Sequence, residues 1–128
     1  MKKIERQTVI FIAQIIIILS FIISVLVAVN LRKTFREVRN LVRARHMETI
    51  LNAVYTYYLI NGEYPPCIPE KGHAIDVREC KEIEPFLTVF PQDPFSNQKY
   101  LIEYLDEEKR GIRIFSSAPE AKGVEVVR

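Results

Sequence analysis

The chain has 128 residues, a formal net charge of only +2 and four glycines. So few glycines argue against a glycine-rich nucleotide loop, and the sequence contains no nucleophile–base pair or tight cluster of metal ligands. We therefore expect a non-enzymatic protein with no cofactor and no small-molecule substrate.

The charge is divided unevenly along the chain. Residues 1–45 carry a formal charge of +7, and residues 46–128 carry −5. A basic N-terminal part indicates contact with anionic lipid or with an acidic neighbouring protein. No aromatic-interleaved basic patch of the nucleic-acid-binding kind and no known DNA-binding motif accompanies these residues, so no nucleic-acid partner is expected.

Residues 9–29 form an uncharged apolar run that is interrupted only by Gln14, Ser20 and Ser24. A helix of roughly 20 residues, at ~1.5 Å per residue, covers the ~30 Å hydrocarbon core of a bilayer. We predict a transmembrane helix over residues 8–29, after a short basic flank at residues 1–7. A cleaved secretory signal is the alternative, but its apolar core would be shorter and a small-residue cleavage pattern would follow it.

Nothing interrupts helix formation after the apolar run. The first glycine is Gly62 and the first proline is Pro65, and both follow Asn61 in a pattern that ends helices. We predict an amphipathic stem helix over residues 30–60 that continues the transmembrane helix.

One line of side chains follows this helix from the membrane into the stem. Its small members let helices approach closely in lipid, and its large apolar members beyond the membrane need a partner. We predict that this line, which we call the seam, is an interface with other subunits; lipid contact and a partly solvated stalk are the alternative. The seam residues are Ala13, Ile17, Ser20, Ser24, Ala28, Leu31, Phe35, Val38 and Val42.

A second apolar stripe begins farther along the stem and is rotated by roughly 140° from the seam. We predict that this head-packing stripe lies against the chain's own C-terminal part. Its members are Met47, Ile50, Leu51, Val54 and Tyr58. His46, beside it, is expected to be a surface residue.

Residues 61–128 are expected to form a small head, of which residues 61–99 are irregular and rich in proline. This segment contains the only two cysteines, Cys67 and Cys80. A disulfide between them would close a loop of about 14 residues and stabilise the head by roughly 3 kcal/mol. A metal site that adds His73 is the alternative, but it lacks closely spaced cysteines and a clear fourth ligand.

Residues 100–127 alternate apolar and polar side chains in the manner of strands. We predict strands at residues 100–105, 112–116 and 124–127, in a three-stranded antiparallel sheet on the head-packing stripe. The acidic residues 106–108 are interpreted as a solvated hairpin tip and not as a metal or acid–base site. The predicted fold class is α+β, with a long N-terminal helix packed at its upper half against a small antiparallel sheet.

Several segments resemble type IV pilin-like proteins, and the pseudopilins of type II secretion most of all. Residues 57–65 (YYLINGEYP) are similar to the family pattern YYxxNGxYP, and residues 91–95 (PQDPF) are similar to its PxDP-aromatic segment before a strand. The long helix and the closing hairpin that ends in residues 116–118 (SSA) agree with this resemblance. It implies assembly into filaments or short pseudopili with other pilin-like subunits, as a homo- or hetero-oligomer through the N-terminal helix.

The N-terminus departs from that family. Residues 2–7 (KKIERQ) contain no glycine for a prepilin peptidase to cut after, and no glutamate lies five residues into the apolar run. The calcium-binding loop of major pseudopilins is not matched either, because residues 116–123 (SSAPEAKG) lack its aspartate. We expect no metal there.

The orientation in the membrane receives opposing signals. Basic residues are more numerous after the apolar run than before it, which by the positive-inside rule places the head in the cytoplasm. The cysteine pair and the family resemblance place it outside. We predict a single-pass protein of the cytoplasmic (inner) membrane of the cell envelope with an extracytoplasmic head. The alternative function is a membrane-anchored binding or sensor module with a pilin-like head that does not polymerise.

Overall fold

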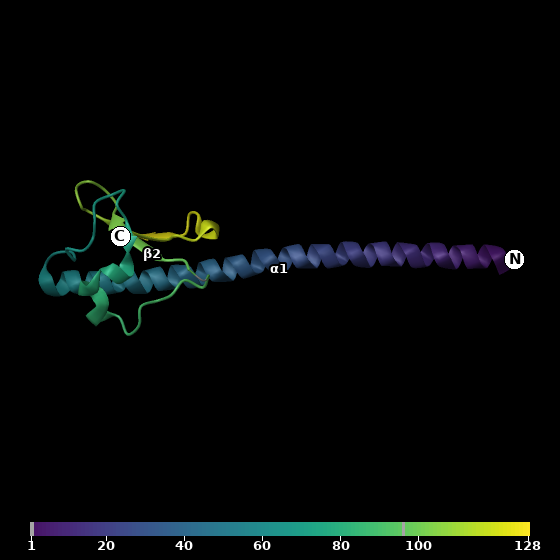
Figure 1. Cartoon of the computed structure of the whole chain (residues 1–128), viewed down its shortest axis with the longest axis horizontal. Coiled ribbons are helices and arrows are strands. Elements are labelled where there is room, and N and C mark those ends of the chain that lie inside the picture. Colours follow the sequence, from purple (N-terminus) through teal and green to yellow (C-terminus); the bar gives the residue numbers. More distant parts are fainter. Residues whose placement is uncertain (1, 96) are drawn as a thin grey trace. The chain divides into compact units, whose positions relative to one another are not determined.

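The computed structural model describes residues 2–95 and 97–128, with side chains from residue 6 onward. A single helix, α1 (Lys2–Asn61), is followed by a four-stranded antiparallel sheet (Figure 1), so the predicted α+β class is confirmed. The helix begins at Lys2 and not near residue 8, because nothing in the basic flank of residues 1–7 opposes helix formation. By contact density the chain divides into two units, one ending at Glu37 and the other comprising Val38–Arg128.

The helix ends at its predicted position for a local reason. Gly62 has φ +77°, a left-handed conformation that glycine adopts without steric cost. Its amide donates to the carbonyl of Tyr58 at 2.8 Å, and the side chain of Asn61 donates to the carbonyl of Tyr57 at 2.9 Å. Carbonyls of the last turn are thus satisfied, as in a typical glycine C-cap.

The sheet has four strands in sequence order, one more than predicted. They are β1 (Ile75–Asp76), β2 (Tyr100–Tyr104), β3 (Ile112–Ser116) and β4 (Glu125–Val127). The prediction missed β1 because a two-residue strand has no alternating pattern to detect. The segment before β2 is also less irregular than expected, since it contains the 3-10 helices η1 (Val77–Glu79) and η2 (Lys81–Phe86).

The core of the second unit is formed by side chains of α1, of one face of the sheet and of the segment between them in sequence. Figure 1 shows the sheet beside the teal part of α1. Ile102 pairs with Ile114 across β2 and β3, and both are fully buried. Four residues of the head-packing stripe belong to the same buried cluster, and Tyr58 is half-buried with its ring stacked on Tyr64 at 4.8 Å. The four are Met47, Ile50, Leu51 and Val54.

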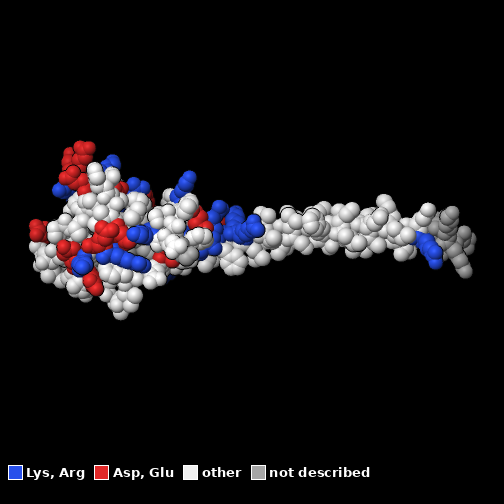
Figure 2. Space-filling view, in the orientation of Figure 1, with Lys and Arg blue, Asp and Glu red and all other residues white. Residues whose placement is uncertain are grey.

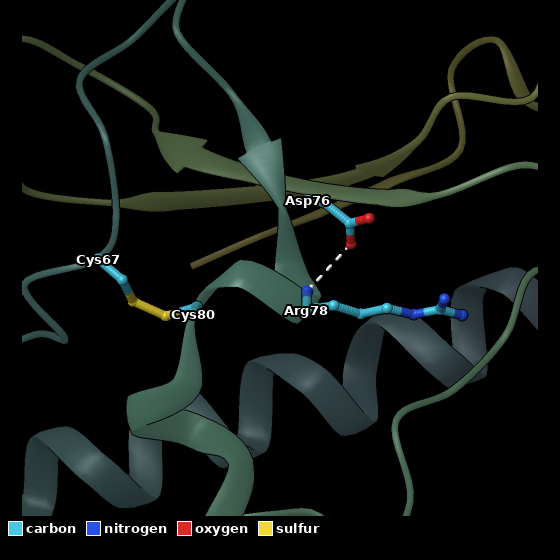
Figure 3. The surroundings of a disulfide bond; sticks show 4 residues. All are labelled: Cys67, Asp76, Arg78 and Cys80. Carbon is cyan, nitrogen blue, oxygen red and sulfur yellow. Dashed lines mark hydrogen bonds between the residues drawn. A yellow bond between two sulfur atoms is a disulfide. The ribbon is translucent and has the colours of Figure 1, made fainter.

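A disulfide joins Cys67 to Cys80, 13 positions apart (Figure 3). Cys80 is buried within the core cluster, and it follows η1, whose first turn is capped by the Asp76 carboxylate accepting from the Arg78 amide at 3.0 Å. Glu82 is the side chain that lies near both sulfurs, whereas His73 is not part of this group. Sulfurs bonded to each other are not thiolate ligands, so the metal alternative with His73 is not supported.

The core predicts that two isoleucines of the same helix contribute very differently to the free energy of unfolding. Ile50 is 1% exposed and Ile60 is 67% exposed. We expect Ile50→Ala to lower the free energy of unfolding by about 2–5 kcal/mol, because it removes buried methyl groups and leaves a cavity. The matched change Ile60→Ala should alter it by no more than ~0.5 kcal/mol. Denaturant unfolding of the full chain in detergent, followed by circular dichroism, measures both, and similar losses would contradict this core.

Candidate interaction surface and buried ion pairs

The first unit presents an apolar surface that the chain itself does not cover. Between residues 9 and 29 the large apolar side chains are exposed, from 42% at Ile15 to 70% at Phe21. Figure 2 shows this stretch as a surface without charged groups. The helix is long and apolar enough to cross a membrane, which makes it a candidate membrane span. A single-pass arrangement is consistent with it.

The two serines within the apolar run are already hydrogen-bonded. Ser20 Oγ donates to the carbonyl of Ile17, and Ser24 Oγ donates to the carbonyl of Ser20, each at 2.8 Å. Hydroxyls that bond to their own helix do not need water, so both residues are compatible with lipid and with close helix packing.

Exposure alone does not separate the seam from the rest of the apolar run, because side chains on every side of residues 9–29 are exposed. Farther along, Leu31, Phe35 and Val38 are exposed by 51–60%, whereas Val42 is half-buried. The seam therefore stays a prediction, and its last member is partly covered by the chain itself.

The second unit contains a buried ion pair that the sequence did not indicate. Arg43 and Asp93 have fully buried side chains, and two nitrogens of the guanidinium donate to the two carboxylate oxygens at 2.8 and 2.9 Å. Asp93 also accepts from Ser116 Oγ at 2.6 Å and from the Phe95 amide at 2.8 Å. A buried charge is tolerated only when it is paired and hydrogen-bonded in this way.

A second carboxylate extends this network. Glu120, in the 3-10 helix η3 (Pro119–Ala121), accepts from two nitrogens of Arg39, both at 2.7 Å, and lies 2.9 Å from Arg43 Nη1. Arg43 Nη1 also donates to Asn40 Oδ1 at 2.7 Å. Helix α1 is thus bound to the loop before β2 and to η3 after β3 by charge-assisted hydrogen bonds.

The network changes the proton affinity of both carboxylates. Burial of Asp93 disfavours its charged form, but the hydrogen bonds from Arg43 and Ser116 outweigh this effect and lower its pKa below the usual value. The hydrogen bonds from Arg39, opposed by burial and reinforced by Arg43, lower the pKa of Glu120 to about 2. Both carboxylates are therefore charged at neutral pH.

Two smaller predictions about side chains can be compared with the structure. His46 is not a surface residue: it is half-buried, and its Nδ1 lies 2.9 Å from the hydroxyl of Tyr100. The acidic segment 106–108 forms a turn in which Asp106 accepts from the amide of Arg110, and Arg110 pairs with both Asp106 and Glu108. Through these contacts Asp106 and Glu108 form part of a charged turn.

No sequence pattern indicated the Arg43–Asp93 pair. Asp93 stood out only as part of the PQDPF segment, and Arg43 only as one of several basic residues of the stem. The one available signal was that Asp93 lies between Pro91 and Pro94. The backbone of such a segment is restricted enough to hold a carboxylate in place.

Comparisons of the chain with protein-family models, with curated proteins and with solved structures found no match.

The buried ion pair predicts different consequences for two arginines that lie two positions apart. Arg43→Met keeps most of the side-chain volume but leaves Asp93 buried without its cation, so we expect the free energy of unfolding to fall by about 3–5 kcal/mol. Arg45 is exposed, and Arg45→Met should change it by no more than ~0.5 kcal/mol. Urea unfolding of both full-length variants tests this prediction. Equal losses of stability in the two variants would show that the Arg43–Asp93 pair does not stabilise the fold.

The lowered pKa values predict a loss of stability in acid. The unfolded chain binds a proton at Glu120 near the ordinary value of 4.5, whereas the folded protein holds this carboxylate charged down to about pH 2. The unfolded state therefore binds more protons in this window, and the free energy of unfolding falls as the pH is lowered through it. Thermal unfolding at pH 6, 4.5 and 3 should show this fall, and Glu120→Gln should make it shallower. The same slope in both proteins would exclude Glu120 as its source.

Proposed function

We propose that this chain is a non-enzymatic, pilin-like protein of the cytoplasmic membrane. In this proposal it is a subunit or accessory of a filament of the type IV pilus or type II secretion kind. Residues 8–29 span the membrane, the head lies on the extracytoplasmic side, and the seam binds other pilin-like subunits. The observation that carries the proposal is one unbroken helix that combines two surfaces, an uncovered apolar one in the first unit and a core-forming one in the second.

The distribution of exposed residues supports an association role for the helix. In the stem, Leu31, Phe35 and Val38 follow the apolar run, outside the hydrocarbon core of the proposed arrangement, and their side chains are exposed. Large apolar side chains that recur along one side of an exposed helix are typical of an interaction surface. Small residues on the same line within the run, such as Ser24, allow the close approach that association in lipid requires.

The head supports the extracytoplasmic orientation. The Cys67–Cys80 disulfide is of a kind that persists in oxidising compartments and is rare in the cytoplasm. The long stem is rich in basic residues, but it packs partly on its own head, where Arg39 and Arg43 are neutralised. The positive-inside rule describes the Lys and Arg content of short loops, whereas these residues lie on a continuous helix.

The seam is tested by cross-linking single cysteines in native membranes. Ser24→Cys lies on the seam and Leu26→Cys lies on the opposite side of the helix, at 100° per residue. We expect oxidation to give disulfide-linked dimers, or adducts with a pilin-like partner, at least several-fold more efficiently for Ser24→Cys. Gel mobility and mass spectrometry of the adducts provide the measurement.

Controls separate the seam from general crowding in the membrane. The unsubstituted chain, whose two cysteines are joined to each other, should give no adduct. Adding Phe35→Glu to the Ser24→Cys chain should reduce the yield, whereas Leu41→Glu, a similarly exposed position off the seam, should not. Equal yields at Ser24→Cys and Leu26→Cys would contradict the seam and favour an anchored binding module that does not polymerise.

A further inference from the structure

Three basic side chains directly follow the apolar run and are not used by the fold. Arg32, Lys33 and Arg36 are exposed, and we call them the basic collar. Within the part of the chain that the structure describes, neither arginine has an ion-pair partner. Lys33 is 4.0 Å from Glu37, with both side chains about two thirds exposed, which makes this a weak surface pair.

The next two arginines along the helix differ from the collar in their surroundings. Arg39 and Arg43 are held by Asp93 and Glu120 in the second unit, as described above. Among the described residues, the chain thus supplies carboxylates for Arg39 and Arg43 and only Glu37 for the collar. The positive charge of the collar is available to a partner.

The depth of the collar indicates which partner this is. Arg32 follows Val29, the last residue of the apolar run, by three positions and Arg36 follows it by seven, which corresponds to ~5–11 Å along a helix. The headgroup layer on each side of the hydrocarbon core is ~5–7 Å thick, and arginine side chains reach several ångströms toward the polar groups that they bind. With residues 9–29 in the hydrocarbon core, the collar lies at the phosphate groups. Figure 2 shows basic side chains next to the uncharged stretch.

We propose that the basic collar binds the headgroups of anionic phospholipids. Guanidinium groups donate two parallel hydrogen bonds to phosphate oxygens, and a basic residue at an anionic membrane surface favours it by about 1 kcal/mol, or about fivefold. The inference rests on the membrane-spanning part of the proposed function and is independent of subunit assembly. An acidic surface of a partner subunit fits less well, because at 100° per residue the collar lies roughly 100–200° around the helix from Leu31 on the seam, where the proposed function places those subunits.

The test measures lipid preference around the full-length protein. The protein is reconstituted in phosphatidylcholine vesicles that contain a trace of spin-labelled phosphatidylglycerol or, separately, spin-labelled phosphatidylcholine. Electron paramagnetic resonance then gives the motionally restricted fraction of each lipid, and hence their relative association with the protein. We expect about fivefold preference for phosphatidylglycerol, falling toward onefold in 1 M salt because salt screens exposed charges.

A matched pair of triple variants locates the effect. Arg32→Gln/Lys33→Gln/Arg36→Gln should reduce the preference to about onefold. Lys71→Gln/Arg78→Gln/Lys81→Gln removes the same charge from exposed head positions whose side chains form no ion pair with the described residues, and it should leave the preference near fivefold. Circular dichroism checks that both variants keep the helix.

Each other outcome overturns the proposal in a distinguishable way. Equal association of the two lipids with the native protein, or equal losses in both triple variants, would exclude a lipid site at the collar. A collar variant that keeps the lipid preference but loses Ser24→Cys cross-linking would assign the collar to an acidic protein surface. The absence of any restricted lipid would show that the chain does not span the bilayer, so that the membrane part of the proposed function fails as well.

Discussion

The arrangement of the second unit depends on one buried cation, the guanidinium of Arg43. A charge with no exposure to water is stable only when opposite charges and hydrogen bonds replace its hydration. Its partners Asp93 and Glu120 come from segments that lie 50 and 77 positions farther along the chain. The helix, the loop before β2 and η3 after β3 must therefore adopt one geometry together, because none of them can satisfy this charge alone.

The ion pairs and the apolar core have different physical roles. The core between α1 and the sheet provides the main stabilisation, but hydrophobic burial is non-directional and would tolerate small shifts of the helix along the sheet. The bidentate hydrogen bonds of Arg43 and Arg39 are directional and fix the position of the helix along the sheet. Ser116, the last residue of β3, donates to Asp93 and so ties the end of the sheet to the same point. A further buried carboxylate, Glu103, accepts from the Gly72 amide at 2.8 Å and fastens a loop to β2 in the same manner.

The parts of the fold that could be predicted are those encoded in a local pattern. The apolar run, the Asn61-Gly62 helix end and the alternation in residues 100–104 and 112–116 each determine a structure within a few residues, and they gave the helix, its end and the main hairpin. Strand β1 escaped because two residues carry no periodicity. The His46–Tyr100 contact and the Arg43–Asp93 pair escaped because they join residues at least 50 positions apart, which no local pattern records.

The arginines of the stem show this limit clearly. Arg32, Arg36, Arg39 and Arg43 are spaced to lie on one side of a helix, and by sequence they form a single basic stripe. Only the placement of Asp93 and Glu120 divides the stripe into arginines that hold the fold together and arginines that have no ion-pair partner among the described residues. The division could not be read from composition, which records a basic stem and an acidic head without showing that the head neutralises part of the stem.

The order of environments along α1 gives this division a physical reason. With residues 9–29 in the hydrocarbon core, as proposed, their apolar side chains need no polar partner, and the collar that follows is close enough to that core for lipid phosphates to accept its hydrogen bonds. Arg39 lies ten residues past Val29, beyond the reach of headgroups, and its charge is met by Glu120 of the same chain. Arg43 is fully buried and requires the strongest pairing, which Asp93 supplies. In the proposed membrane arrangement, hydrocarbon, phosphate and protein carboxylates thus succeed one another as the partners of a single helix, and each segment carries the side chains that its surroundings can satisfy.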